Sequence, residues 1–311
     1  MTTRSLIIDC DPGVDDAIAI LLALASPSEF DLLGITTVAG NVPLALTQMN
    51  ARKICQLAGV LMIPVFAGCP RPLLQPLVTA EEVHGGTGLQ GADLPEPHMP
   101  LQPQHGVDFL IEQLMHAKAP ITLAMLGPLT NLAVALIKQP AIVNNIAEVV
   151  MMGGSVTHGN VTPSAEFNCY VDPHAAKVVF EAGAKLTMIG LDVTYTVLTT
   201  PARLAQIRDI GTPVAIAAAG MLAFYGVEEA TRLGMAGSPL HDPCVIAYLL
   251  QPDLFRGQDA YVEVEISSPL TLGRTVVDAG KVLDQPANAY VIRTADADGF
   301  YQLLIEGLKQ L

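Results

Sequence analysis

The chain has 311 residues, of which 51% are hydrophobic and 15% are charged, and its formal net charge is −14. This composition excludes a disordered chain, and the negative charge argues against nucleic acid or an anionic membrane as the main partner, because both bind basic surfaces. The five cysteines show no C-x-x-C spacing, and no signal peptide or membrane-spanning run is visible. We therefore expect reduced thiols in a cytoplasmic protein.

Apolar strand-like runs alternate with helical patterns through the first two-thirds of the chain. Strands are expected at Leu6–Asp9, Leu32–Val38, Ile63–Ala67, Ile121–Leu126, Val149–Met152 and Leu186–Leu191. Helices are expected at Asp16–Ala25, Leu44–Ala58, Val107–Ala117, Leu129–Lys138 and Pro173–Ala182. Because the strands are apolar throughout and alternate with helices, they predict an α/β fold with one open, mostly parallel sheet flanked by helices.

The last third of the chain is less regular. Helices are expected at Pro201–Asp209, Pro213–Glu229, after His241-Asp242-Pro243, and at Gly299–Leu311, and strands at Ala260–Ile266, Gly273–Asp278 and Ala289–Thr294. No internal repeat or low-complexity linker is visible, so residues 1–311 are expected to form a single domain. The Pro-rich run from Leu94 to Pro103 is the best candidate for a mobile excursion.

Four aspartates, Asp9, Asp11, Asp15 and Asp16, lie in the turn between the first strand and the first helix, and no Lys or Arg occurs from Leu6 to Leu24. Like charges this close raise one another's pKa or require a cation, and a hard divalent cation prefers carboxylate oxygens. One of these residues could simply cap the helix. Four exceed what capping requires, so this acid corner is predicted to bind a metal ion.

Two further polar clusters interrupt apolar surroundings. The first runs from Gly153 to Asp172, and the second from Ser238 to Cys244. Their candidate functional side chains are Asn160, Glu166, Asn168, His241 and Asp242. Either Asn alone could cap a turn, and His241-Asp242 could begin the next helix. Ligands of open α/β sheets bind beyond the carboxyl ends of the strands, which is where the active site is expected.

The charge of these segments indicates the kind of ligand. Neither cluster, nor the acid corner, contains Lys or Arg, whereas phosphate sites normally use basic side chains. An uncharged, hydroxyl-rich substrate is therefore expected. A carboxylate-held cation can bind vicinal hydroxyls and a water molecule, and a remaining carboxylate can take the proton of that water. This chemistry fits hydrolysis at the anomeric carbon of a sugar, where the transition state resembles an oxocarbenium ion.

The run Asp9-Cys10-Asp11-Pro12-Gly13-Val14-Asp15-Asp16-Ala17 resembles the signature of the inosine-uridine-preferring nucleoside hydrolases. Further segments match that family in chain order: Ile35–Asn41, Val83-His84-Gly85, Gly127–Asn131, Met151–Gly154, Ala165–Asn168, Gly190-Leu191-Asp192 and His241-Asp242-Pro243. The resemblance spans almost the whole chain. It implies an open α/β domain, a bound Ca²⁺, hydrolysis of ribonucleosides to ribose and free base, and a homodimer or homotetramer.

The resemblance also implies a role for individual residues. The metal ligands would be the carboxylates of Asp11, Asp16 and Asp242 and the backbone carbonyl of Leu126. Asp11 would also be the general base that activates the attacking water, and His241 would donate a proton to the leaving base. Asp9 would support the metal ligands from behind. Substrate contacts are implied for Asp15, Asn41, His84, Asn160, Glu166, Asn168 and Asp242.

The preferred base is left open. The chain contains no Trp, which disfavours the purine-specific members that stack the base between indoles. The helix before His241 carries Glu228, Glu229, Thr231 and Leu233 where some relatives have aromatic residues, with Tyr225 as the nearest aromatic. These features favour pyrimidine nucleosides, and a purine or broad specificity is the alternative.

Two other classes of protein compete with this interpretation. An aspartate-nucleophile phosphohydrolase also opens with D-x-D after its first strand, but it would usually carry Gly-Thr next, where this chain has Pro12-Gly13. It would also need a basic residue for phosphate. A calcium-dependent nucleoside or sugar binder without catalytic activity is the remaining alternative, and turnover distinguishes it from an enzyme.

Overall fold

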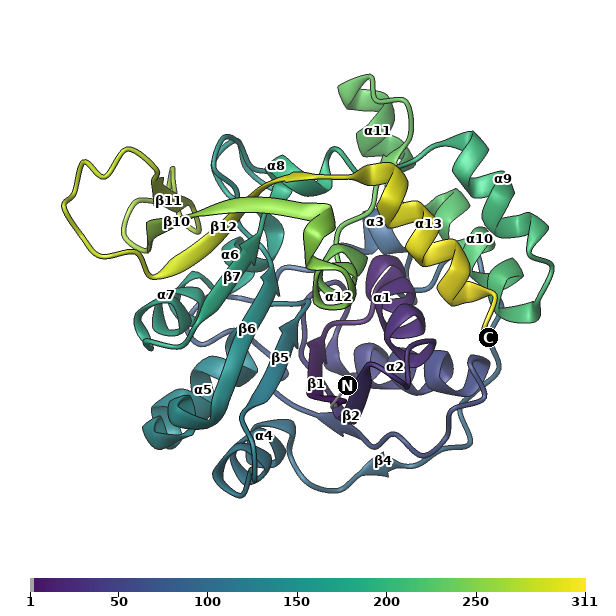
Figure 1. Cartoon of the computed structure of the whole chain (residues 1–311), viewed down its shortest axis with the longest axis horizontal. Helices are drawn as coiled ribbons and strands as arrows, with labels where there is room; N and C mark the ends of the chain where they lie inside the picture. Colours follow the sequence, from purple (N-terminus) through teal and green to yellow (C-terminus); the bar gives the residue numbers. More distant parts are fainter. Residues whose placement is uncertain (1–2) are drawn as a thin grey trace.

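The computed structural model describes residues 3–311 and contains an open ten-stranded sheet in the order β11-β10-β12-β7-β6-β5-β1-β2-β3-β4 (Figure 1). Its strands are β1 (Arg4–Cys10), β2 (Phe30–Thr37), β3 (Val65–Ala67), β4 (Leu101–Gln102), β5 (Ile121–Met125), β6 (Ile146–Met152), β7 (Leu186–Ile189), β10 (Phe255–Val264), β11 (Thr275–Asp278) and β12 (Ala289–Ala295). Neighbouring strands pair in parallel from β4 through β3, β2, β1, β5, β6 and β7 to β12, whereas β10 pairs antiparallel with both β12 and β11. The predicted mostly parallel sheet is confirmed.

Helices cover both faces of the sheet (Figure 1). The helices are α1 (Val14–Leu24), α2 (Leu44–Leu57), α3 (Glu81–His84), α4 (Gly106–Met115), α5 (Thr130–Lys138), α6 (Phe167–Val171), α7 (Pro173–Glu181), α8 (Leu191–Thr194), α9 (Pro201–Asp209), α10 (Pro213–Phe224), α11 (Val227–Leu233), α12 (Pro243–Leu250) and α13 (Ala297–Leu308). Helices α1, α2, α10, α12 and α13 enclose one apolar core, and α4, α5 and α7 enclose the other.

Strand β1 shows how the sheet separates the two cores. Because successive side chains of a strand point to opposite faces, Leu6 and Ile8 lie in the core beneath α1, whereas Ile7 lies in the core beneath α5. The next residue on the Ile7 face is Asp9, whose carboxylate is therefore directed toward α5. The alternation that builds the two cores therefore also directs Asp9 toward α5, where Asn131 donates to it.

Two expectations about the chain path need correction. The helix predicted from Pro213 to Glu229 is broken: α10 ends at Phe224 and α11 begins at Val227. Gly226 between them adopts φ 66°, a left-handed conformation that a helix cannot contain and that glycine adopts without strain. The run from Leu94 to Pro103 lies along α2 instead of projecting from the molecule, and it ends in the edge strand β4.

Several short elements have no counterpart in the predicted pattern. These are β4, α3, α6 and α8, and a two-stranded sheet of β8 (Leu198–Thr199) and β9 (Ser238–Pro239). In residues 3–311 no single helix is long and apolar enough to cross a membrane. The pair α10 and α11 would reach that length and composition only together, and it is bent by 44°.

Candidate functional site

The acid corner forms where β1 ends and α1 begins. Asp16 occupies the first turn of α1, and its carboxylate accepts the backbone N–H groups of Asp11 at 3.1 Å and Gly13 at 3.0 Å. It also accepts the side-chain amide of Asn41 at 3.0 Å. Asp16 is therefore the acid that caps the helix, and it satisfies N–H groups that would otherwise be left without a partner.

Asp11 is fully buried and is held differently from Asp16. Its Oδ2 accepts the backbone N–H of Asn41 at 2.6 Å, while its Oδ1 has no hydrogen-bond partner among residues 3–311. Two glycines make room for this carboxylate, because a Cβ at Gly40 would lie 2.0 Å from Oδ2 and one at Gly127 would lie 2.3 Å from Oδ1. A buried carboxylate oxygen without a donor is costly, and a cation or a bound water would satisfy it.

Asp242, from a distant part of the chain, adds a further carboxylate to the corner. Ligand oxygens of Asp15, Asp16 and Asp242 lie within 4.8 Å of one another, and all three residues are buried. Burial, reinforced by the neighbouring carboxylates, raises the pKa of Asp16 to about 7 and the pKa values of Asp11 and Asp242 well above their ordinary range. So much buried negative charge is stable only with protons or a cation, so the donor set fits a hard metal ion.

Behind the corner lies Asp9, on the α5 side of the sheet. Its Oδ2 accepts the hydroxyl of Thr36 at 2.5 Å and the side-chain amide of Asn131 at 2.8 Å. Burial raises the pKa of Asp9 to about 7, against the lowering effect of these two hydrogen bonds. Asp9 thus fixes the strand ends beneath the corner and does not line the cavity described below.

The wall opposite the corner is built at the start of α6. Glu166 caps this helix by accepting the backbone N–H groups of Asn168 at 2.8 Å and Cys169 at 3.1 Å, and it also accepts the N–H of Gly154 at 2.8 Å. Asn168 donates its side-chain amide to the carbonyl of Leu126 at 2.7 Å. This bond places Asn168 directly beside the carbonyl that the family pattern assigns to the metal.

Two buried histidines and a tyrosine form the third side of the site. His84 accepts the backbone N–H of Val14 through Nδ1 at 3.0 Å, and burial lowers its pKa to about 4, so its ring is neutral with the proton on Nε2. His241 shares a 2.7 Å hydrogen bond with Thr194, and burial lowers its pKa as well. Tyr225 lies between the two rings and donates its hydroxyl to Asp15 at 2.7 Å.

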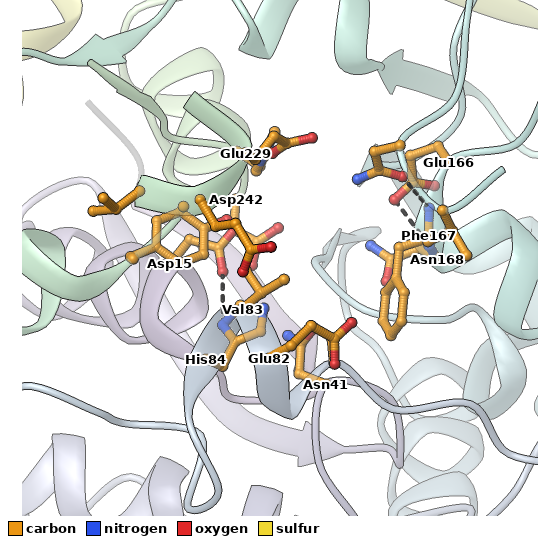
Figure 2. A pocket seen from close by; sticks show the side chains of 18 of the residues that line it. Asp15, Asn41, Glu82, Val83, His84, Glu166, Phe167, Asn168, Glu229 and Asp242 are labelled. Atoms are coloured by element: carbon orange, nitrogen blue, oxygen red, sulfur yellow. Dashed lines mark hydrogen bonds and ion pairs between the residues drawn. The ribbon is translucent and has the colours of Figure 1, made fainter. Parts of the chain in front are cut away.

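These three sides enclose a cavity of about 700 Å³, a volume typical of small-molecule sites (Figure 2). Of the residues predicted from the sequence, the following line it: Asp15, Asn41, His84, Leu126, Asn160, Glu166, Asn168, His241 and Asp242. Asp11 and Asp16 lie beneath its floor, fully buried. Asn160 also caps a turn, which was the alternative to substrate binding for this residue: its Oδ1 accepts the N–H of Phe167 at 3.0 Å.

The cavity has further lining residues to which no role was assigned. Phe167, Phe224 and Tyr225 supply aromatic surface, and Glu82, Glu228, Glu229 and Arg232 supply charge. Arg232 corrects the expectation of a site without a basic residue. That expectation came from the segments next to the motifs, whereas Arg232 reaches the cavity from α11, a helix that the sequence pattern did not separate from α10. Its guanidinium lies 3.8 Å from the carboxylate of Glu229.

Comparison with known proteins identifies the family. The family model described as inosine-uridine preferring nucleoside hydrolase matches residues 6–302. An uncharacterized protein of Schizosaccharomyces pombe is 46% identical, over 98% of this chain and 99% of the relative. A pyrimidine-specific ribonucleoside hydrolase of Photobacterium profundum is 45% identical, again over 98% and 99%. The solved structure of a purine-preferring ribonucleoside hydrolase from Gardnerella vaginalis has a TM-score of 0.91 and 33% identity, covering 98% of each chain. The chain belongs to the inosine-uridine preferring nucleoside hydrolases and is an enzyme that hydrolyses N-glycosidic bonds.

Proposed function

We propose that this enzyme hydrolyses ribonucleosides to ribose and free base with Ca²⁺ as its metal ion, and that it favours pyrimidine nucleosides. The buried Asp11 Oδ1, which lacks a hydrogen-bond partner among residues 3–311, carries the proposal, and it is supported by the buried Asp15, Asp16 and Asp242, whose ligand oxygens lie within 4.8 Å of one another. The pyrimidine preference is supported by the relatives named pyrimidine-specific, at 43–45% identity. The purine-preferring enzyme of similar fold is less similar in sequence, at 33%.

The residues that would hold the metal are Asp11, Asp16, Asp242 and the carbonyl of Leu126. Their hard oxygens match the preference of Ca²⁺, whose 6–8 ligands would leave positions for substrate hydroxyls and water. When bound, the ion supplies a positive charge that favours loss of a proton from water and anchors vicinal hydroxyls. Asn168, which donates to the Leu126 carbonyl at 2.7 Å, would then turn its amide toward the ribose.

Side chains of the protein would perform the remaining steps of the reaction. Asp11 would take the proton of the attacking water, because its Oδ1 has no donor to compete with that proton. Asp15, Asn41, Asn160, Glu166, Asn168 and Asp242 would hold the ribose hydroxyls, and His84 would contact the substrate from α3. Carboxylates on this face would also stabilise the positive charge that develops on the sugar.

The leaving base would depart toward His241. Burial lowers the pKa of this ring, so a neutral imidazole would face the base with a single N–H group to donate. Thr194, at 2.7 Å from Nδ1, would hold that ring in place. The neutral ring would donate a hydrogen bond to the departing base, and only its imidazolium form, which the lowered pKa disfavours, would transfer a proton to the base and end as the neutral ring.

We further propose that residues 1–311 form one domain that works as a homodimer or homotetramer in the cytoplasm, with neither nucleic acid nor membrane as a partner. One continuous ten-stranded sheet with a core on each face supports the single domain. All five cysteines are free thiols, as a reducing compartment requires. The net charge of −14 opposes binding to polyanions.

Release of free ribose tests the proposed function directly. The purified protein is incubated with uridine, cytidine, inosine and adenosine in the presence of Ca²⁺, after chelation, and after Ca²⁺ is restored, with 2′-deoxyuridine as a control for recognition of the 2′-hydroxyl. We expect chelation to abolish release, Ca²⁺ to restore it, and pyrimidine nucleosides to react fastest. Tight nucleoside binding without ribose release would instead indicate a calcium-dependent binder.

A further inference from the structure

The cavity has two chemically different ends. The acid corner, Asn41 and the Glu166–Asn168 wall carry the hydroxyl-binding groups, so the ribose belongs at that end. The other end is formed by α11 and by the residues just before it, and it presents Tyr225, Glu229 and Arg232. A nucleoside whose ribose occupies the first end must direct its base toward α11.

Glu229 is the least exposed charged group at the α11 end. The Tyr195 hydroxyl donates to its Oε1 at 2.7 Å, and Arg232 lies 3.8 Å from the same oxygen. The Glu229 side chain is only 16% exposed, whereas that of Arg232 is 64% exposed. Within residues 3–311 no hydrogen bond engages the second oxygen, Oε2. Figure 2 shows Glu229 extending from α11 into the space that faces Glu166.

Tyr195 connects this carboxylate to the leaving-group side of the site. Its ring packs edge-on against the ring of His241, with centroids 5.9 Å apart, while its hydroxyl holds Glu229. The same side chain therefore fixes Glu229 relative to the proposed proton donor of the base. Glu229 is therefore held in a defined position toward the rim of the base, whereas Glu228, which also lines the cavity, is exposed and has no hydrogen bond or ion pair within residues 3–311.

We propose that Glu229 makes the enzyme prefer nucleosides whose base carries an exocyclic amino group, an inference that rests on the proposed function. A carboxylate can only accept hydrogen bonds. The amino groups of cytosine and adenine can donate a hydrogen bond to Oε2. Uracil and hypoxanthine have a carbonyl oxygen at the same position, which has no hydrogen to donate and whose partial negative charge is repelled by the carboxylate. A buried polar group left unpaired by the wrong substrate is an effective basis for discrimination.

The test compares substrates within pairs that differ at this position and, with it, at the adjacent ring nitrogen, which is an acceptor in cytosine and adenine and carries a hydrogen in uracil and hypoxanthine. We measure kcat/KM for cytidine against uridine and for adenosine against inosine, in the native enzyme and in Glu229→Gln. The amide keeps an oxygen for Tyr195 and places an N–H donor where Oε2 was. We expect both amino-to-oxo ratios to exceed one in the native enzyme and to fall about tenfold to a hundredfold in Glu229→Gln, as expected for one partly solvated contact.

Glu228→Gln is the matched control, because it makes the same chemical change at the neighbouring carboxylate, which also lines the cavity but is exposed and makes no hydrogen bond or ion pair within residues 3–311. Its ratios should change by less than about twofold, as expected for a solvated charge. The inference is overturned if Glu229→Gln leaves both ratios unchanged, or if Glu228→Gln lowers them equally, which would indicate a general field effect. Absence of ribose release from all four nucleosides would instead reject the proposed function, so the two failures can be distinguished.

Discussion

Asp11 and Asp16 are both fully buried aspartates of the acid corner, yet their surroundings prepare them for different tasks. Asp16 has both oxygens engaged by N–H donors, which fixes the start of α1 and keeps the carboxylate in one orientation. Asp11 has one oxygen engaged by Asn41 and one without a partner in the described residues. Of the two, only Asp11 therefore retains an oxygen that is free to accept a proton.

This difference makes Asp11→Asn a sharp test of the proposed general base. The amide can keep its oxygen toward the N–H of Asn41 and place its nitrogen where Oδ1 was, so the local shape is retained while the proton acceptor is lost. We expect kcat to fall by about 10³-fold, within the range for loss of a general base, with an unchanged circular dichroism spectrum. Exposed Asp31→Asn is the control and should retain full activity. Near-native turnover in folded Asp11→Asn would remove Asp11 from this role.

Much of the site could be predicted because its residues follow strand ends in compact motifs. Asp15 in the first turn of α1, Glu166 and Asn168 at the start of α6, and His241 and Asp242 just before α12 line the cavity and were predicted from such motifs. Contacts between distant segments could not be predicted in this way. Tyr225 meets Asp15 across 210 residues, and Arg232 enters on a helix whose start depends on the conformation of Gly226. Such contacts depend on tertiary packing, which local patterns do not encode.

The main strands and helices were predicted to within a few residues because apolar periodicity dominates them. The exceptions are elements of two to five residues, such as β4, α3 and α8, which are too short to show a period. The α10–α11 break was missed because α10 is almost entirely apolar and the pattern continues past Phe224. The order of the strands in the sheet, with β1 between β5 and β2, is a long-range property that periodicity does not reveal.

Helix α5 holds together the strand ends that carry the acid corner. Asn131, near its start, donates to Asp9 at 2.8 Å and to the carbonyl of Thr37 at 3.1 Å, and it accepts the N–H of Cys69 at 2.7 Å. Asp9 lies in β1, Thr37 ends β2, and Cys69 lies two residues after the end of β3. A Cβ at Gly68 would lie 2.2 Å from the Asn131 oxygen, so glycine is needed for this close approach.

We expect Asn131→Ala to destabilise the protein by about 3 kcal/mol, because it leaves three polar partners of the side chain unsatisfied, most of them buried. The melting temperature should fall by about 6 °C. Asn145→Ala is the comparison, since Asn145 donates a single bond to the carbonyl of Leu114 at 2.9 Å, and it should cost about 1 kcal/mol. Thermal melts of the two variants check this, and equal losses would show that Asn131 does not tie the strands together.

For the whole molecule, the acid corner makes stability depend on pH and on the metal together. Asp9 and Asp16 have pKa values raised from 3.8 to about 7, so in the absence of metal the folded state holds protons that the unfolded chain releases. In the metal-free protein, the contribution of these two groups to the free energy of unfolding is therefore greatest at low pH, and this contribution is lost as pH rises through about 7. His84, whose pKa is lowered from 6.5 to about 4, acts in the opposite direction as pH falls below 6.5.

A bound cation must displace the protons of these carboxylates, so its stabilising effect should grow with pH. At a Ca²⁺ concentration about 100 times the dissociation constant, binding adds about 2.7 kcal/mol, which raises the melting temperature by about 5 °C. We expect this shift at pH 8 and a much smaller one at pH 5.5 when melts in Ca²⁺ and in chelator are compared at each pH. The contribution of His84 is common to both melts and cancels in the difference. A shift of equal size at the two pH values would mean that the cation binds away from the protonated acids of the corner.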